Sequence, residues 1–277
     1  MTFQKYFCNF RLMLKNILQN KHIMILHTIL LFLTTTLPSI VIYSGIHERY
    51  TDNSYSYMRN GYNEIFDFLS FSTPYQMLIT VAVAIITSFC CYSYLNSSKS
   101  LIFHNSMPYK RSNMYFTRFL SGLIQLALPV IIIFAVNSAM YFGYDVSRYS
   151  SYGEYSTMLT NALVCLFMYA LTFSVGAFTA NISSNVFAQG ISMLFVFLSY
   201  ILSIAILAGS MDVWFETYYI QLDFDARYIF PPSIIAAGKF TTEVLIYDIC
   251  YFVLFAALGC VAAVKRATES TDRKSVV

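Results

Sequence analysis

The chain has 277 residues, of which 57% are apolar, 18% are aromatic and only 11% are charged. Soluble domains carry roughly 25% charged residues. This composition therefore excludes an ordinary soluble globular protein, which needs a charged surface to stay dispersed. The mean hydropathy of +0.59 agrees with that exclusion. We therefore predict an integral membrane protein. We expect no nucleic-acid partner, because the net charge of +3 is spread over connecting segments.

The first 22 residues are predicted to form an amphipathic helix on the inner membrane surface. Apolar residues recur at spacings of three and four, and polar and basic residues occupy the other side. Such a helix places its apolar side among acyl chains and its cations near anionic lipid head groups. The phenylalanines make a simple extension of the first span into water the weaker interpretation. The predicted inner-leaflet anchor consists of Phe3, Lys5, Phe7, Phe10, Arg11 and Lys15.

Six apolar runs are long enough to cross a bilayer, since a spanning helix takes about 20 apolar residues. Runs this long predict α-helices, because a backbone in lipid must satisfy its hydrogen bonds internally. The predicted fold class is therefore an all-α integral membrane protein with six transmembrane helices. The predicted spans are 23–43, 75–95, 119–142, 158–180, 187–208 and 244–264.

Prolines and small residues occur at particular positions within these spans. Pro38 and Pro129 are expected to kink the first and third spans or to free a backbone carbonyl there. Gly176 and Ala180 have the small-xxx-small spacing that allows close helix packing, with subunit pairing as the weaker interpretation. In the outer segment before the second span, the apolar residues 65–71 are expected to lie on the membrane surface.

Lysine and arginine are distributed unequally between the two sides of the predicted spans. The N-terminal stretch, the segment between spans two and three, and the C-terminal tail 265–277 each carry four of the 17 Lys and Arg residues. The other segments collect most of the acids and many tyrosines. The positive-inside rule therefore predicts a multi-pass protein with both termini in the cytoplasm.

Little in the sequence points to chemistry on this chain. Asp248 is the only acid within a predicted span, and it lies about 6 Å from the outer boundary at a rise of about 1.5 Å per residue. We interpret it as an interfacial residue rather than a proton relay, and we interpret His27 as a packed residue. No metal-binding motif and no GxxxxGK[ST] phosphate loop is present, so we expect no bound cofactor.

The segment between spans two and three is the most informative. It is basic, yet its middle is apolar. Ser106 is suited to cap a helix that has Pro108 in its first turn, and Met114 and Tyr115 are then expected to project apolar surface. We predict a short cytoplasmic helix over 104–118 that docks a partner. The alternative is a membrane-surface helix that leads into the third span.

The run SMPYKR at 106–111, followed by MYFTRFLSGLI at 114–124, resembles the signature between spans two and three of ABC-2-type transporter permeases of Gram-positive bacteria. In those relatives a His precedes the Ser, where this chain has Asn105. Relatives also often continue past the last span, so we expect a short or truncated member. Weaker likenesses lie at Ala180, Asn181, Ala188 and Gln189, and at Lys265, Arg266 and Glu269.

The resemblance implies a permease subunit of an ABC exporter in the bacterial cytoplasmic membrane. It implies pairing with a second permease subunit, as a homodimer or heterodimer, and binding to a dimer of separate ATPase subunits that hold ATP and Mg²⁺. The chain itself is then not an enzyme. A membrane sensing or immunity component that recognises a peptide through its tyrosine-rich outer segments is the alternative. The residues implied to contact the ATPase are Ser106, Met107, Pro108, Tyr109, Lys110 and Arg111.

Overall fold

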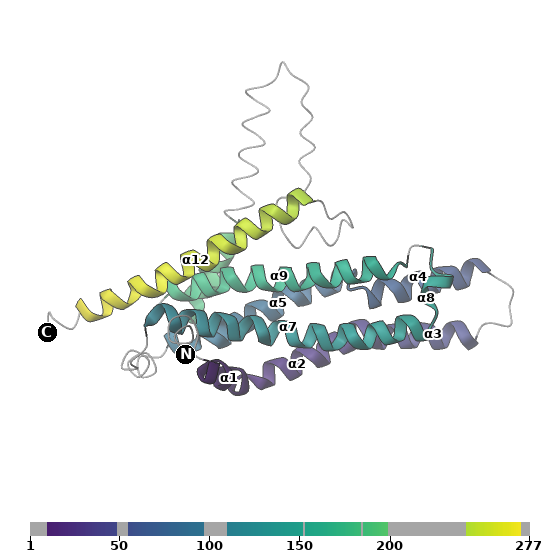
Figure 1. The fold of residues 1–277 in the computed structure, drawn as a ribbon, viewed down its shortest axis with the longest axis horizontal. Coiled ribbons are helices and arrows are strands. Elements are labelled where there is room, and N and C mark those ends of the chain that lie inside the picture. Colours follow the sequence, from purple (N-terminus) through teal and green to yellow (C-terminus); the bar gives the residue numbers. More distant parts are fainter. Residues whose placement is uncertain are drawn as a thin grey trace, which may run out of the picture.

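The computed structural model describes residues 10–48, 55–96, 110–151, 153–183, 185–198 and 242–272. Every element in these ranges is a helix, which confirms the all-α prediction. The longest helices run side by side and form an elongated bundle (Figure 1). Helix α1 and the C-terminal part of α12, the first and last described elements, lie toward the same end of this bundle.

The first long helix is continuous but irregular. It consists of α2 (Lys21–Leu31), the π-helical turn η2 (Phe32–Thr36) and α3 (Leu37–Glu48). The ring of Pro38 would clash with the carbonyl of Thr34 in a regular α-helix, and a π-turn widens the backbone at that position. The Thr35 hydroxyl donates to the Leu31 carbonyl at 2.8 Å, at the start of this irregular turn.

The second long helix is broken. Helix α4 (Tyr55–Leu69) ends at a turn, and α5 (Pro74–Tyr92) and the short η3 (Ser93–Asn96) follow it. Phe71 has a φ of 60°, which is uncommon for a bulky residue and interrupts the helix. Pro74 then occupies the first turn of α5, where a missing N–H costs nothing.

Helix α4 packs against α3 and α7. The expectation that residues 65–71 lie on the membrane surface is wrong, because Ile65, Phe66 and Leu69 are buried within the bundle. Their side chains pack with those of α3, α8 and the end of α7, so this apolar run covers protein rather than lipid.

The centre of the bundle is the 33-residue helix α7 (Arg111–Gly143). It contacts α1, α2, α4, α5, α9 and α12. A short helix α8 (Val146–Tyr149) follows it, and α9 (Tyr155–Ile182) then returns along the bundle. Helix α12 (Thr242–Asp272) packs across α9 and α7 (Figure 1).

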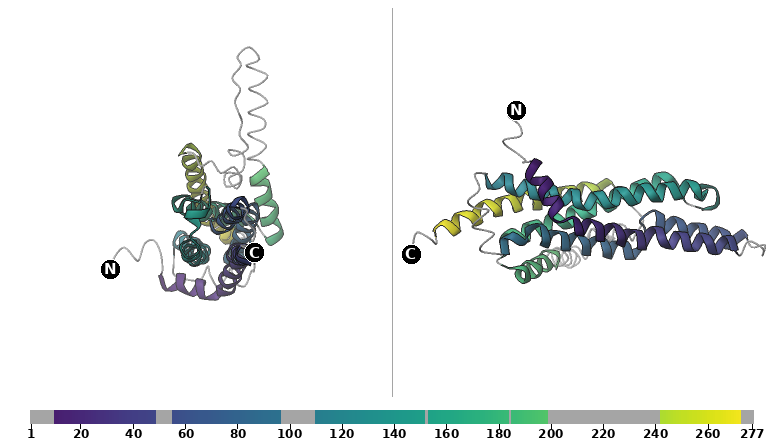
Figure 2. Two further views of the ribbon diagram at one scale, coloured as in Figure 1. Left: turned by 90° about the vertical axis from the view of Figure 1, so that its right-hand side faces the viewer. Right: turned by 90° about the horizontal axis from the view of Figure 1, so that it is seen from below.

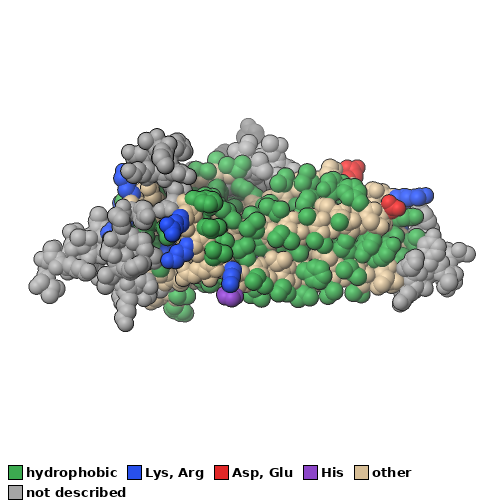
Figure 3. Space-filling model, turned by 60° about the horizontal axis from the view of Figure 1, so that its bottom comes forward, with side chains coloured by type: hydrophobic (Ala, Val, Ile, Leu, Met, Phe, Trp, Pro, Cys, Tyr) green, Lys and Arg blue, Asp and Glu red, His purple; other side chains and the backbone are tan. Residues whose placement is uncertain are grey.

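Four helical stretches are long and apolar enough to cross a membrane, and they overlap the first four predicted spans. Of the predicted span 187–208, the structure describes only the shorter apolar helix Val186–Leu198. Of the predicted span 244–264, helix α12 holds the apolar stretch Ile249–Lys265. Figure 3 shows a broad apolar band with charged side chains toward the two ends of the bundle. The four stretches are Lys21–Ile46, Leu78–Leu95, Arg111–Gly143 and Tyr155–Ile182.

Helix α1 (Phe10–Gln19) lies across the bundle rather than along it, as the two views of Figure 2 show. Asn20 separates it from α2, and the chain changes direction there. The sequence predicted one helix over the first 22 residues. The described part of that helix is α1, and Phe3, Lys5 and Phe7 lie outside the described residues.

Candidate partner-docking site at the basic end of the bundle

Basic side chains gather at the end of the bundle that carries α1 and the start of α7, which we call the basic end. Among the described side chains, the acids Glu64, Asp67, Asp145 and Glu154 belong to the other end. The two ends therefore differ in charge, as the uneven distribution of Lys and Arg in the sequence predicts. The exposed or half-exposed cations among the described side chains of the basic end are Arg11, Lys15, Lys21, Lys110, Arg111, Arg118 and Lys265.

Helix α1 is held on the basic end by one face. Met13 and Asn16 are buried against the bundle. The Gln125 side chain donates through Nε2 to the carbonyl of Asn16 at 3.2 Å, and it accepts from the Cys91 thiol through Oε1. The sequence placed Asn16 on the water-facing side of this helix. It is buried instead, because α1 lies directly over α7.

The outward face of α1 has two parallel ridges. Phe10, Leu14 and Leu18 follow one another at a spacing of four and are exposed. Arg11 and Lys15 lie one residue further along and are exposed too. An apolar ridge beside a basic ridge is the surface that an interfacial helix presents to acyl chains and head groups. Phe10, Arg11 and Lys15 therefore share the outward side of α1, and their role as an inner-leaflet anchor stays a prediction.

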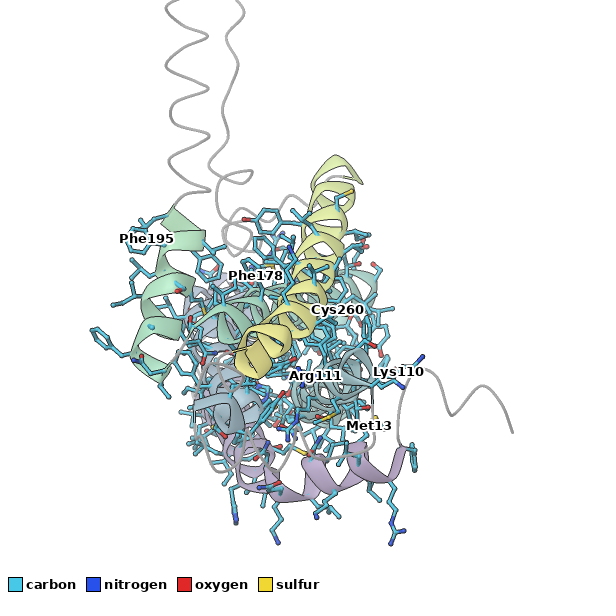
Figure 4. All side chains as sticks on the ribbon, turned by 90° about the vertical axis from the view of Figure 1, so that its left-hand side faces the viewer. Met13, Lys110, Arg111, Phe178, Phe195 and Cys260 are labelled. Atoms are coloured by element: carbon cyan, nitrogen blue, oxygen red, sulfur yellow. The ribbon has the colours of Figure 1, made fainter. Side chains whose placement is uncertain are left out.

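Lys110 and Arg111 are the described members of the predicted ATPase contact. Lys110 is extended and exposed at the N-terminus of α7, and its carbonyl accepts from the backbone N–H of Met114 at 3.2 Å. In Figure 4 the Lys110 side chain points away from the bundle, whereas the Arg111 side chain lies over its end. The other predicted members, Ser106, Met107, Pro108 and Tyr109, lie outside the described residues.

The second half of the predicted 104–118 helix is not a separate element. Residues 111–118 are the first turns of α7, because no proline or glycine interrupts the helix before the third span. Met114 and Tyr115 were expected to project apolar surface, and this expectation is wrong because both are buried. Their rings and side chains pack inside the bundle, so the exposed part of the site near α7 is Lys110 with Arg111.

Arg118 has a structural position. Its Nη1 donates to the Cys91 carbonyl at 2.9 Å, and its guanidinium lies 3.6 Å from the centre of the Tyr94 ring. A cation at the last turn of α5 is favourable because the carbonyl end of a helix carries partial negative charge. The basic segment is thus divided, with Arg118 joining α7 to α5 and with Lys110 exposed.

Tyr115 links α7 to α12, a contact that the sequence did not reveal. Its hydroxyl donates to the Ala256 carbonyl at 3.1 Å. This approach depends on Gly259, because a Cβ at that position would overlap the Tyr115 hydroxyl. Tyr115 lies five residues after Lys110, so the start of α7 is fastened directly to the last helix. The available signal was only a tyrosine and a glycine within apolar runs.

The turn after α9 brings together residues of the second fragment that resembles ABC-2 permeases. Gln189 is buried, and its Nε2 donates to the Gly176 carbonyl at 3.3 Å. Asn181 is buried and donates to the Ala177 carbonyl of its own helix. A Cβ at Gly176 would overlap the Ser88 hydroxyl, so this glycine serves packing of α9 against α5 within one chain.

The opposite end, which we call the tyrosine end, is formed by α3, α4, α8 and the adjoining ends of α7 and α9. Its tyrosine rings are largely used in packing with each other. Tyr43 stacks on Tyr144 with 3.8 Å between ring centres, and Tyr62 stacks on Tyr149 at 4.8 Å. Burial, and then the neighbouring Tyr43, raises the pKa of the Tyr144 hydroxyl. These stacks leave less aromatic surface for a peptide than the sequence suggested.

His27 and Asp248 are the two remaining residues for which the sequence predicted a role. His27 is buried in the bundle, and its Nε2 lies 2.7 Å from the Tyr169 hydroxyl of α9, consistent with its interpretation as a packed residue. The side chain of Asp248, near the start of α12, lies outside the described part of the structure. Within that described part, no group of three or more His, Cys, Asp or Glu side chains is placed to hold a metal ion.

No protein-family model, curated protein or solved structure matches this chain. The basic end is therefore a candidate site because of its geometry alone. It combines an exposed cation at the start of the central helix, an amphipathic helix beside it, and a direct fastening from Tyr115 to the last helix.

Proposed function

We propose that the protein is the permease subunit of an ABC exporter, with six spans, that forms the substrate path and couples to separate ATPase subunits through its basic end. The observation that carries this proposal is the position of Lys110 and Arg111 at the start of α7. That helix contacts most of the other described helices, so a force on its first turn is transmitted to most of the bundle.

The coupling is understood as a change between two arrangements. Closure of an ATPase dimer displaces the segment 104–111, and this biases α7 toward its second arrangement by differential contacts. Tyr115 carries the displacement to α12 through its bond to the Ala256 carbonyl, and Arg118 carries it to the end of α5. Cations on a docking rim pair with acids of a partner, while apolar residues such as Met107 and Tyr109 supply anchors.

Helix α1 acts in this proposal as a fixed support in the inner leaflet. Its exposed ridges suit lipid, and its buried face holds α7 through Gln125. The membrane then resists the movement of α1 while α7 is displaced. A second permease subunit completes the path, as a homodimer or a heterodimer, in the bacterial cytoplasmic membrane.

The alternative, a sensing or immunity component that binds a peptide at its tyrosine end, has weaker support. Among the described tyrosines of this end, Tyr62 is buried, and Tyr43, Tyr144 and Tyr149 are half-exposed and used in ring stacking. Asn63 Oδ1 also accepts from the hydroxyls of Ser150 and Ser151, at 2.8 and 3.1 Å, which tightens this end further.

The test is affinity purification of the tagged chain from its native membranes, with identification of the ATPase that comes with it. The Tyr109→Ala/Arg111→Glu variant is expected to lose the ATPase, because it removes an aromatic anchor and reverses a charge on the rim. Arg148→Glu is the matched control, since Arg148 is exposed at the tyrosine end.

Both variants should insert into the membrane at the level of the unchanged chain. Recovery of the ATPase with the Tyr109→Ala/Arg111→Glu variant at the unchanged level would remove the coupling assignment. Failure of the unchanged chain to bring any ATPase would remove the exporter proposal itself.

A further inference from the structure

The described part of the bundle contains two large hydrophobic clusters, and a third, smaller one is formed by Val175, Met193 and Phe255. The first fills the part toward the basic end, with Leu31, Val83, Leu126 and Phe173 among its members. The second fills the tyrosine end and is formed by Ile46, Tyr62, Ile65, Phe66, Leu69, Tyr141, Val146 and Met158. Phe134 packs against both clusters.

A layer of polar side chains lies between the two clusters, and it crosses each long helix at the position where cluster membership changes. The first long helix has Thr35, Thr36 and Ser39 there, all buried. In α7 the position is Asn137, which is also fully buried. The turn before α5 contributes Ser70 and Thr73, α5 contributes Gln76, and the half-buried Asn161 is the α9 residue at this level.

One chain of hydrogen bonds spans this layer. The Thr36 hydroxyl donates to Asn137 Oδ1 at 2.9 Å, and Asn137 Nδ2 donates to the Leu69 carbonyl at 3.1 Å. Asn137 therefore joins η2 to the end of α4 across α7. We call the three residues Thr36, Asn137 and Leu69 the latch.

The backbone is irregular near this layer in two of the long helices. The first has the π-turn η2 before Pro38, and the second is broken at 70–73 with Phe71 at a φ of 60°. Helix α7 is continuous at Asn137, and its proline, Pro129, lies about two turns earlier, where it leaves the Gln125 carbonyl without its helical N–H donor. Helix α9 passes through the layer without interruption. Bends in helices concentrate at such positions, and π-turns are frequent at functional sites.

From these observations we infer that the tyrosine end tilts as one unit against the rest of the bundle, with α9 as the pivot and the latch holding the closed arrangement. The unit consists of α3, α4, α8 and the adjoining ends of α7 and α9. Two separately packed clusters move more readily than one continuous core, because tilting between them costs few apolar contacts. The buried side chains of Asn137 and Thr36 favour the closed arrangement, because moving the two parts of the latch apart leaves buried polar groups without hydrogen-bond partners.

Hydrogen–deuterium exchange of the full-length protein in lipid nanodiscs tests this inference. Asn137→Leu removes both bonds of the latch, and Thr36→Val removes one of them while keeping the side-chain shape. Exchange at the amides of 55–69 should rise about threefold to twentyfold for each bond lost, from the measured strength of interhelical bonds in membranes. Ser138→Ala is the neighbouring control, because its hydroxyl bonds only to the Phe134 carbonyl and to Tyr155.

A rise confined to the tyrosine end, with amides 162–182 of α9 unchanged, supports the hinge. An unchanged exchange rate at 55–69, or an equal rise along all of α9, overturns it. If Asn137→Leu does not fold, Thr36→Val decides the question alone, with Thr36→Ser as the variant that restores the donor. None of these readings depends on a transport assay.

Discussion

At the residue scale, the interior is organised by polar side chains and by glycines within apolar helices. Asn137, Gln125 and His27 each bond to a different helix from their own. Interhelical hydrogen bonds in membrane proteins contribute about 0.6 kcal/mol on average, so each one selects an arrangement more than it stabilises the whole protein. Their identity as isolated polar residues is evident in the sequence, but their partners are not.

Gly122 is a residue where a single methyl group should matter. It belongs to the Leu-Ser-Gly run that resembles ABC-2 permeases, and a Cβ there would overlap the ring of Phe173, which is fully buried in α9. Gly122→Ala should therefore lower the free energy of unfolding by about 1–3 kcal/mol, because overpacking forces the ring or a helix to shift. Denaturant unfolding of the purified protein in detergent measures this change.

The control for that prediction is Gly45→Ala in α3, where a Cβ meets nothing within 4 Å. It should be neutral, or stabilising by up to about 1 kcal/mol through better helix propensity. Equal stability of the two variants would show that α7 and α9 are not in the close contact described here.

At the element scale, the helices differ in which of their faces contact protein and which are suited to contact lipid. Residues 65–71 were expected on the membrane surface, but Ile65, Phe66 and Leu69 at the end of α4 are buried in the tyrosine end, where they meet α3 and α8. Helix α1 combines a buried face with two outward ridges of opposite character. Periodicity alone identifies such a helix as amphipathic, but it does not say which apolar residues face protein and which face lipid.

The two ridges of α1 lead to a prediction about depth in the membrane. Spin labels are introduced at Leu14→Cys or Lys15→Cys, in a background with the native cysteines replaced, and the protein is reconstituted in liposomes. The label at 14 should be the more accessible to oxygen, and the label at 15 to a water-soluble nickel complex, because adjacent ridges face acyl chains and head groups. Power-saturation EPR measures both accessibilities.

A label at Asn16→Cys serves as the reference, since Asn16 is buried against the bundle and should be poorly accessible to both reagents. If the label at 14 responds mainly to the nickel complex, α1 lies in water and the anchor assignment of Phe10, Arg11 and Lys15 is lost.

At the scale of the whole molecule, the two ends have different chemistry and the apolar band separates them (Figure 3). The basic end collects α1, Lys110 and the later part of α12, and the tyrosine end collects the described acids that include Asp145. A membrane-embedded protein with this division should be oriented by the positive-inside rule.

Orientation is tested by labelling single cysteines in sealed right-side-out vesicles. Asp145→Cys should react with a membrane-impermeant maleimide in intact vesicles, whereas Lys110→Cys should react only after permeabilisation. Reaction of Lys110→Cys in intact vesicles would place the basic end outside, and no cytoplasmic ATPase could then reach it.

Composition and apolar run length determined from the sequence alone that the chain is helical and suited to a membrane, because a low charge content and runs of about 20 apolar residues leave few other solutions. The uneven placement of Lys and Arg likewise predicted the two unlike ends. The tertiary structure decided that Met114 and Tyr115 are buried, that 65–71 lie inside the bundle and that Asn137 meets Thr36 and Leu69. These contacts depend on which helices are neighbours and on how each helix is rotated about its axis. The sequence of an apolar helix does not reveal this, because most of its faces can pack against either lipid or protein.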